Sequence, residues 1–155
     1  MTYTKKELKN YLKRLLKDQT GLDNFSFEYQ SGHTAFHTRL RILITSTKIE
    51  QQRIPRGIEV GSPEEANAAK VHETEFSIEN LSTFVELLLK KKIWDLENCT
   101  DRALPDTAQL TFTIRENDNI VFTQKVWQNC RNDDDRTKDL IRAIASLIPM
   151  NWSPP

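Results

Sequence analysis

The sequence has few of the residues that build covalently linked or metal-held folds. Its 155 residues include two cysteines, Cys99 and Cys130, and no CxxC pair. Two isolated thiols cannot form a zinc site by themselves. In a reducing compartment we expect them to be free thiols, placed near enough to be oxidised to a bridge.

Glycine and long apolar runs are also scarce. The four glycines form neither a phosphate-binding loop nor a dinucleotide fingerprint, and no serine lies in a GxSxG elbow. No apolar run exceeds three residues, as in the leucines at 87–89, which is far short of a membrane span. The N-terminus lacks the apolar segment of a secretion signal. The sequence thus has no visible catalytic motif, and we expect a cytoplasmic protein.

Net charge is absent, but the charges are segregated. The chain has 22 basic and 22 acidic residues, so no global field favours nucleic acid or an anionic membrane. Residues 1–20 nevertheless carry six basic and two acidic side chains, whereas residues 57–86 carry one lysine and seven glutamates. The lysines at 5, 9, 13 and 17 form a stripe. It is either a solvated helix face or a contact for an acidic partner, including the acidic segment of a second copy.

Three segments have helical periodicity. The first begins at Thr4 with Glu7 completing a capping box, buries an apolar stripe and stops near Gly21. The second begins at Ser77, and the third begins in residues 132–140 and ends at Pro149. The expected buried stripes are Leu8, Tyr11, Leu12, Leu15 and Leu16; Leu81, Phe84, Val85 and Leu88; and Leu140, Ile141, Ile144, Leu147 and Ile148.

Two hairpins are predicted from alternating apolar residues. In the first, a two-residue turn at Ser31-Gly32 places Gln30 opposite His33 and Phe27 opposite Phe36, and residues 48–54 continue as a third strand. Residues 71–76 can add another short strand. In the second hairpin, a three-residue turn at Asn117–Asn119 joins the two strands. Leu110, Phe112, Ile114, Ile120, Phe122 and Val126 should then face the core.

These elements predict an α+β fold with the order α-βββ-α-ββ-α. We expect one domain over residues 1–150, built on an antiparallel sheet of about five strands with the helices packed on one face. A mobile loop is expected at about residues 55–70, with a short helix at 63–70, and a flexible tail at 151–155.

A metal site or cofactor is not expected. His33 and His37 are four residues apart on a predicted strand, which separates them by roughly 13 Å, too far to share one ion. The acidic run at residues 133–135 could bind a hard cation, but such residues more often cap a helix.

The polar face of the sheet is the candidate binding surface. His37, Arg39 and Arg41 project from one strand, and the second hairpin places Arg115, Lys125 and Trp127 on the same side as three threonines. An exposed tryptophan beside arginine and lysine is typical of a contact surface, and it could also stack a nucleic-acid base. The alternative is an ordinary solvated sheet face.

The order of elements resembles that of emfourin-type small inhibitors of metalloproteases. The matching stretches are "YQSGHTAF", "LLLKKKIWDL", "LTFTIRENDNIVFTQ" and "LIRAIASLI", within residues 25–148. The chain departs from that pattern by His33 in place of a second glycine, by the basic N-terminal helix and by the acidic insert. No inhibitory residue transfers. The resemblance implies a binding protein rather than an enzyme.

Three functions fit these observations. The first is a small non-enzymatic protein-binding domain with an interaction or inhibitor-like role. Its partner would be another protein or a second copy of the chain in a homodimer. The second is a weak nucleic-acid binder that uses the basic sheet face and the lysine stripe. The third is a hydrolase whose site assembles from residues distant in sequence.

Overall fold

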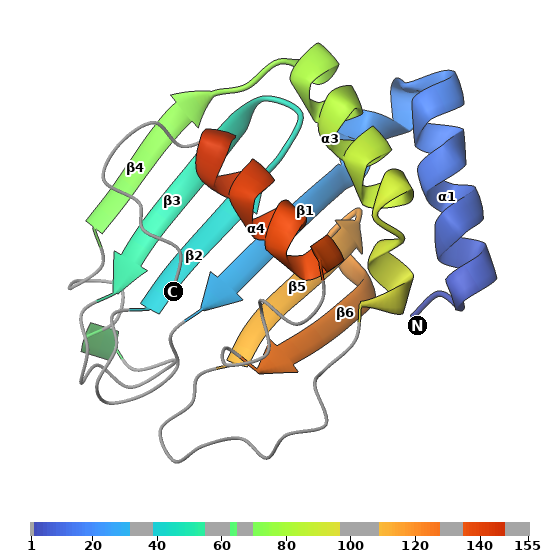
Figure 1. Ribbon diagram of the computed structural model, residues 1–155. Helices are drawn as coiled ribbons and strands as arrows, with labels where there is room; N and C mark the ends of the chain where they lie inside the picture. Colours follow the sequence, from blue (N-terminus) through green and yellow to red (C-terminus); the bar gives the residue numbers. More distant parts are fainter. Residues whose placement is uncertain are drawn as a thin grey trace.

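The chain folds around one antiparallel sheet with its helices on a single face (Figure 1). The structure is a computed structural model, and it describes residues 2–31, 39–54, 63–64, 70–96, 109–127 and 135–147. The strands are β1 (Phe25–Ser31), β2 (Arg39–Ile44), β3 (Lys48–Ile54), β4 (Lys70–Glu75), β5 (Gln109–Glu116) and β6 (Asn119–Trp127). Helices α1 (Lys5–Asp18), α3 (Ile78–Lys90) and α4 (Asp135–Leu147) cover the sheet, with short 3-10 helices η1 (Thr20–Asn24) and η2 (Ile93–Asp95). The predicted α+β class is confirmed.

The sheet has six strands in the order β4-β3-β2-β1-β5-β6. This is one more than the five expected, because residues 70–75 do pair with β3 as a full strand. β1 lies near the centre, between β2, which follows it in the chain, and β5, which comes much later. The first strand is therefore covered on both edges by other strands.

The helix starts lie where the sequence places them. Thr4 and Glu7 form the reciprocal capping box of α1, and the Ser77 side chain accepts from the Asn80 amide at the start of α3. The end of α1 differs from the prediction. The helix stops at Asp18 because Gln19 adopts a left-handed conformation with φ 57°, so that Gly21 lies in η1.

The first hairpin has a different register from the predicted one. Phe27 pairs with Ile44 and Ser31 pairs with Leu40, so Ser31 belongs to the ladder and the two-residue turn is wrong. The observed register is shifted by an even number of residues, which keeps the apolar side chains of both strands on one face. The face assignment was therefore correct although the partners were not.

The second hairpin reaches the predicted pairing by another route. The turn contains two residues, Asn117 and Asp118, both with positive φ, rather than three. A bulge at Ile114/Arg115 then shifts the register by one, so that Ile114 pairs with Phe122 as expected. The bulge also turns the Ile120 side chain away from the core, so that it is 43% exposed. Val121 is buried in its place.

The core lies between the sheet and the three helices. The predicted stripe of α3 is buried, and Phe84 packs edge-to-face on Phe27 of β1 with ring centroids 5.0 Å apart. Phe112 of β5 contacts Tyr29 of β1. Most of the α1 and α4 stripes are buried too, and Leu16 and Leu147 pack at the edge of the core.

Several expectations lie outside the described residues. They concern the loop at about 55–70 and its helix, apart from Pro63, Glu64 and Lys70, and the tail at 151–155. They also concern both cysteines, His33 and His37, and the first two aspartates of the acidic run.

Candidate functional site

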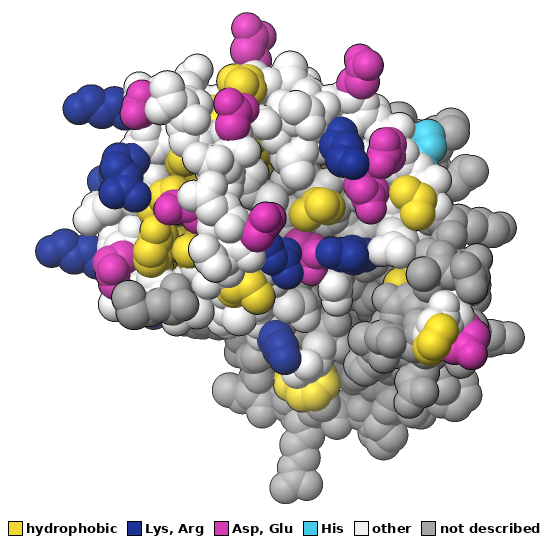
Figure 2. Space-filling view, turned by 180° about the vertical axis from the view of Figure 1, so that it is seen from behind, with side chains coloured by type: hydrophobic (Ala, Val, Ile, Leu, Met, Phe, Trp, Pro, Cys, Tyr) yellow, Lys and Arg dark blue, Asp and Glu magenta, His cyan; other side chains and the backbone are white. Residues whose placement is uncertain are grey.

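One face of the sheet has no described helix over it, and Figure 2 views the molecule from that side. We call this surface the open face. Charged, polar and apolar side chains are interspersed on it. Its outward positions follow from the strand pairing and are Ser26, Glu28, Gln30, Arg39, Arg41, Leu43, Lys48, Glu50, Gln52, Ile54, Val71, Glu73, Glu75, Gln109, Thr111, Thr113, Arg115, Ile120, Thr123, Lys125 and Trp127. Ile54, at the end of β3, is buried although it lies on this face.

A buried carboxylate lies at the centre of the open face. Glu28 is only 4% exposed although it points away from the helices. Arg41 of β2 donates to Glu28 Oε2 through Nε at 2.8 Å, and Nη2 of the same guanidinium lies 2.7 Å from the same oxygen. Arg115 of β5 reaches this oxygen at 3.4 Å, and Gln30 donates to Oε1 at 2.9 Å. Such charge-assisted contacts satisfy a carboxylate that would otherwise be costly to bury.

The charges on the open face are divided between its two halves. The acidic half, on β3 and β4, has Glu50, Glu73 and Glu75 against Lys48. Lys48 bridges Glu73 at 3.0 Å and Glu50 at 3.4 Å, and hydrogen bonds to these carboxylates raise the pKa of the lysine.

The basic half lies on the other four strands. It has Arg41, Arg115 and Lys125 against Glu28. Counted over the described side chains, the acidic half carries a net charge of −2 and the basic half a net charge of +2. The face is therefore polarised across its strands although these charges sum to zero.

The predicted binding residues are partly brought together. Arg41, Arg115, Lys125 and Trp127 share the open face as expected. Arg39 pairs with Ile54 through its backbone, but its side chain lies outside the described residues, as does all of His37. The expectation of an exposed Trp127 is wrong. Its ring is half-buried and packs against the edge of the core.

Glu28 is the residue that the sequence did not single out. It looks like any polar position of an alternating strand. Its special role arises because β1 lies between the strands that carry Arg41 and Arg115. The signal in the sequence is a carboxylate in the middle of a strand of otherwise neutral residues, and it has meaning only once the strand order is known.

Within the described segments, no three His, Cys, Asp or Glu side chains gather as a metal-binding group. No helix among those segments has the length and apolar character needed to cross a membrane.

No protein-family model matches this chain, and no curated protein matches its sequence.

Proposed function

We propose that this chain is a non-enzymatic protein-binding domain that uses the open face, and that its partner is a second copy of the chain. The observation that supports this most strongly is the polarity of the face, with an acidic half on β3 and β4 and a basic half on the other strands. Such a surface is complementary to itself. The resemblance to emfourin-type inhibitors also favours a binding role.

Symmetry makes the complementarity specific. In a two-fold dimer, the same patch of both copies meets. If the axis runs parallel to the strands between two stacked sheets, β4 of one copy lies over β6 of the other. The acidic half then faces the basic half twice. An axis perpendicular to the strands would place like charges together, so the charge pattern selects one arrangement.

The size and composition of the face suit a modest interface. Six strands about 4.8 Å apart and about 23 Å long give roughly 600–700 Å² in projection, near the ~800 Å² per partner of a standard interface. Two of the exposed large apolar side chains, Val71 at 56% and Ile120 at 43%, lie on its outer strands. Arg41, Arg115 and Trp127 add residue types that are common in interface hot spots.

Sedimentation velocity over a range of protein and salt concentrations tests the proposal. We expect a monomer–dimer equilibrium that weakens as salt screens the charges. Lys125→Glu or Glu73→Lys alone should weaken the dimer, and the two together should restore it. Across this axis Lys125 faces Val71 of the other copy, and Glu73 is the carboxylate of β4 nearest to that position. Lys9→Glu on α1, outside the open face, is the matched control.

A different result would exclude the second copy as the partner. A chain that stays monomeric at every concentration, or a double variant no better than the singles, contradicts the dimer. If single-stranded DNA bound instead, with affinity falling steeply with salt, the nucleic-acid alternative would replace it.

A further inference from the structure

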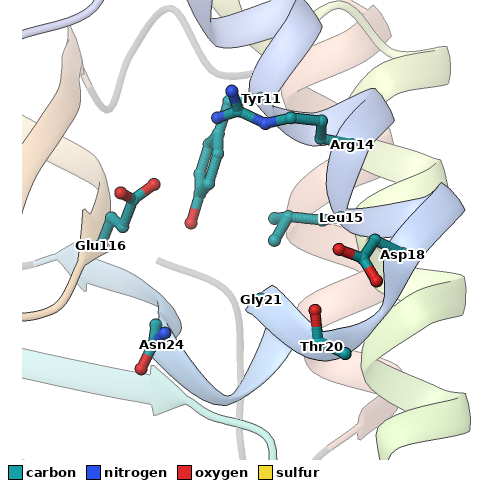
Figure 3. A pocket seen from close by; sticks show the side chains of 8 residues that line it. All are labelled: Tyr11, Arg14, Leu15, Asp18, Thr20, Gly21, Asn24 and Glu116. Carbon is teal, nitrogen blue, oxygen red and sulfur yellow. The ribbon is translucent and has the colours of Figure 1, made fainter.

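A pocket lies where α1 meets η1 and the turn between β5 and β6 (Figure 3). Its volume is about 190 Å³, which exceeds the space needed by a single ordered water. The polar groups that matter here are Tyr11, Arg14, Asp18 and Glu116, and Leu15 provides an apolar wall. The pocket has no residue in common with the open face, so it is independent of the proposed dimer.

Backbone contacts hold the pocket walls together. The Tyr3 amide before α1 donates to the Val121 carbonyl of β6 at 2.7 Å, and the Asn117 amide in the turn donates to the Asn24 carbonyl at 2.9 Å. The start of α1 and the end of η1 are thus both tied to the same hairpin. This fixes the position of Glu116 relative to Tyr11 and makes the pocket a formed feature of the fold.

Tyr11 presents an unsatisfied group to the pocket. The residue is 4% exposed, and its hydroxyl makes no hydrogen bond within the described residues. Figure 3 shows this hydroxyl pointing into the space between Glu116, Leu15 and Asn24. Burial, and then the negative charge of Glu116, raise the pKa of Tyr11, so the hydroxyl stays neutral at physiological pH. A neutral phenol oxygen can accept a hydrogen bond from a bound donor.

Glu116 supplies the charge that selects the ligand. This half-buried carboxylate accepts from the Tyr3 hydroxyl at 3.2 Å, and it has no salt bridge within the described part of the chain. The Arg14 guanidinium lies over the Tyr11 ring, 5.7 Å from its centroid. With Asp18, the lining carries two carboxylates and one cation. The excess negative charge disfavours an anion.

We propose that this pocket binds an alkylammonium group. Its N–H donors would reach the carboxylate of Glu116 and the hydroxyl oxygen of Tyr11, and its alkyl chain would lie along Leu15. The ammonium supplies both a donor for the buried hydroxyl and a positive charge for the carboxylate, and a neutral or anionic ligand lacks that charge. The chemistry is the same whether the group belongs to a free amine or to the lysine of a protein.

Titration calorimetry of the full chain with n-butylamine, n-butanol and butyrate at neutral pH tests the charge requirement. We expect binding of n-butylamine alone. Glu116→Gln should weaken it by about tenfold or more, since it removes the charge from a charge-assisted hydrogen bond. Tyr11→Phe, which keeps the ring, should weaken it by several-fold. Asp118→Asn removes a carboxylate from the adjacent turn without touching the pocket, and it should bind like the parent chain.

The outcomes separate the source of the amine from the existence of the site. If N-acetyl-lysine methylamide binds as tightly as n-butylamine, the pocket is assigned to a protein lysine. If n-butylamine binds and N-acetyl-lysine methylamide does not, the pocket is assigned to a free amine. Equal binding of n-butanol and n-butylamine, or an unchanged affinity in both Tyr11→Phe and Glu116→Gln, overturns the proposal. Because these variants leave the open face intact, dimerisation should persist in them whatever the calorimetry shows.

Discussion

Arg41 and Arg115 approach the same carboxylate unequally. Arg41 makes two contacts below 3 Å with Glu28, whereas Arg115 makes one at 3.4 Å. Replacing Arg41 by Met keeps the apolar stem but leaves the buried carboxylate with its weaker cation. We expect Arg41→Met to lower the free energy of unfolding by about 1–3 kcal/mol. Arg115→Met should cost less, and urea unfolding of both variants measures the difference.

Equal losses for the two arginine variants would mean that Glu28 is held by both cations alike. The double variant Arg41→Met/Glu28→Met is a useful control, because it removes the charge together with its main partner. It should be more stable than Arg41→Met alone if an uncompensated charge is the cause.

Trp127 and Phe112 occupy opposite faces of the same hairpin. Phe112 is fully buried, so Phe112→Ala should destabilise the fold by about 3–5 kcal/mol. Trp127 is half-buried at the end of β6, so Trp127→Ala should cost clearly less and should also weaken self-association. Thermal melts and sedimentation of both variants test this. If Trp127→Ala melts as badly as Phe112→Ala, the ring serves the core and not the open face.

At the scale of elements, the β5–β6 turn is a two-residue connection whose residues both have positive φ. Asn117 and Asp118 have φ of 51° and 68°, the left-handed region that β-branched residues avoid. We expect Asp118→Val to destabilise the chain by about 1–2 kcal/mol, whereas Asp118→Gly should be neutral or stabilising. Denaturant unfolding measures both, and a well-tolerated valine would contradict the assigned turn.

Signals from residues close in sequence predicted the helices and strands well. They did not predict which residues of separate strands pair with each other. The capping box at Thr4 and the stripe of α3 are read from neighbours within one or two helical turns, and both are confirmed. The β5–β6 pairing was predicted correctly from Ile114–Phe122 onward, whereas the turn is one residue shorter than expected and the bulge at Ile114/Arg115 compensates for the difference. The β1–β2 register failed because an early turn at Ser31-Gly32 and the longer observed connection both keep the apolar face inward.

The candidate site was predicted only in outline for the same reason. Which side chains share a face follows from alternation along each strand, and this placed Arg115, Lys125 and Trp127 together. The contact of Arg41 and Arg115 with Glu28 needs the order β2-β1-β5, which joins strands far apart in the chain. The half-burial of Trp127 depends on tertiary packing at the end of β6, which alternation does not report.

For the whole molecule, the two tyrosines near Glu116 link stability to alkaline pH. Burial, followed by the charge of Glu116, raises the pKa of both Tyr3 and Tyr11 in the folded chain. Their contribution to stability is therefore complete below the unfolded value of about 10 and is lost as pH rises through the folded values. We expect Tyr11→Phe to reduce the loss of stability above about pH 10, as measured by chemical unfolding across that range.

Neutral pH provides the control for this prediction. The Tyr11 hydroxyl makes no hydrogen bond within the described residues, so its removal should leave the free energy of unfolding nearly unchanged there. A large loss at neutral pH would show that the hydroxyl is satisfied in solution.

The position of β1 has a consequence for how the protein is made. Phe25 pairs with Glu116, so one edge of this apolar strand cannot close until the ribosome has synthesised β5. At about 5–20 residues per second, β1 waits roughly 5–20 s after its own synthesis. During that interval a strand carrying Phe25, Phe27 and Tyr29 has an unpaired edge, which is a hazard for aggregation. This hazard ends only when the last hairpin has emerged and β5 pairs with β1.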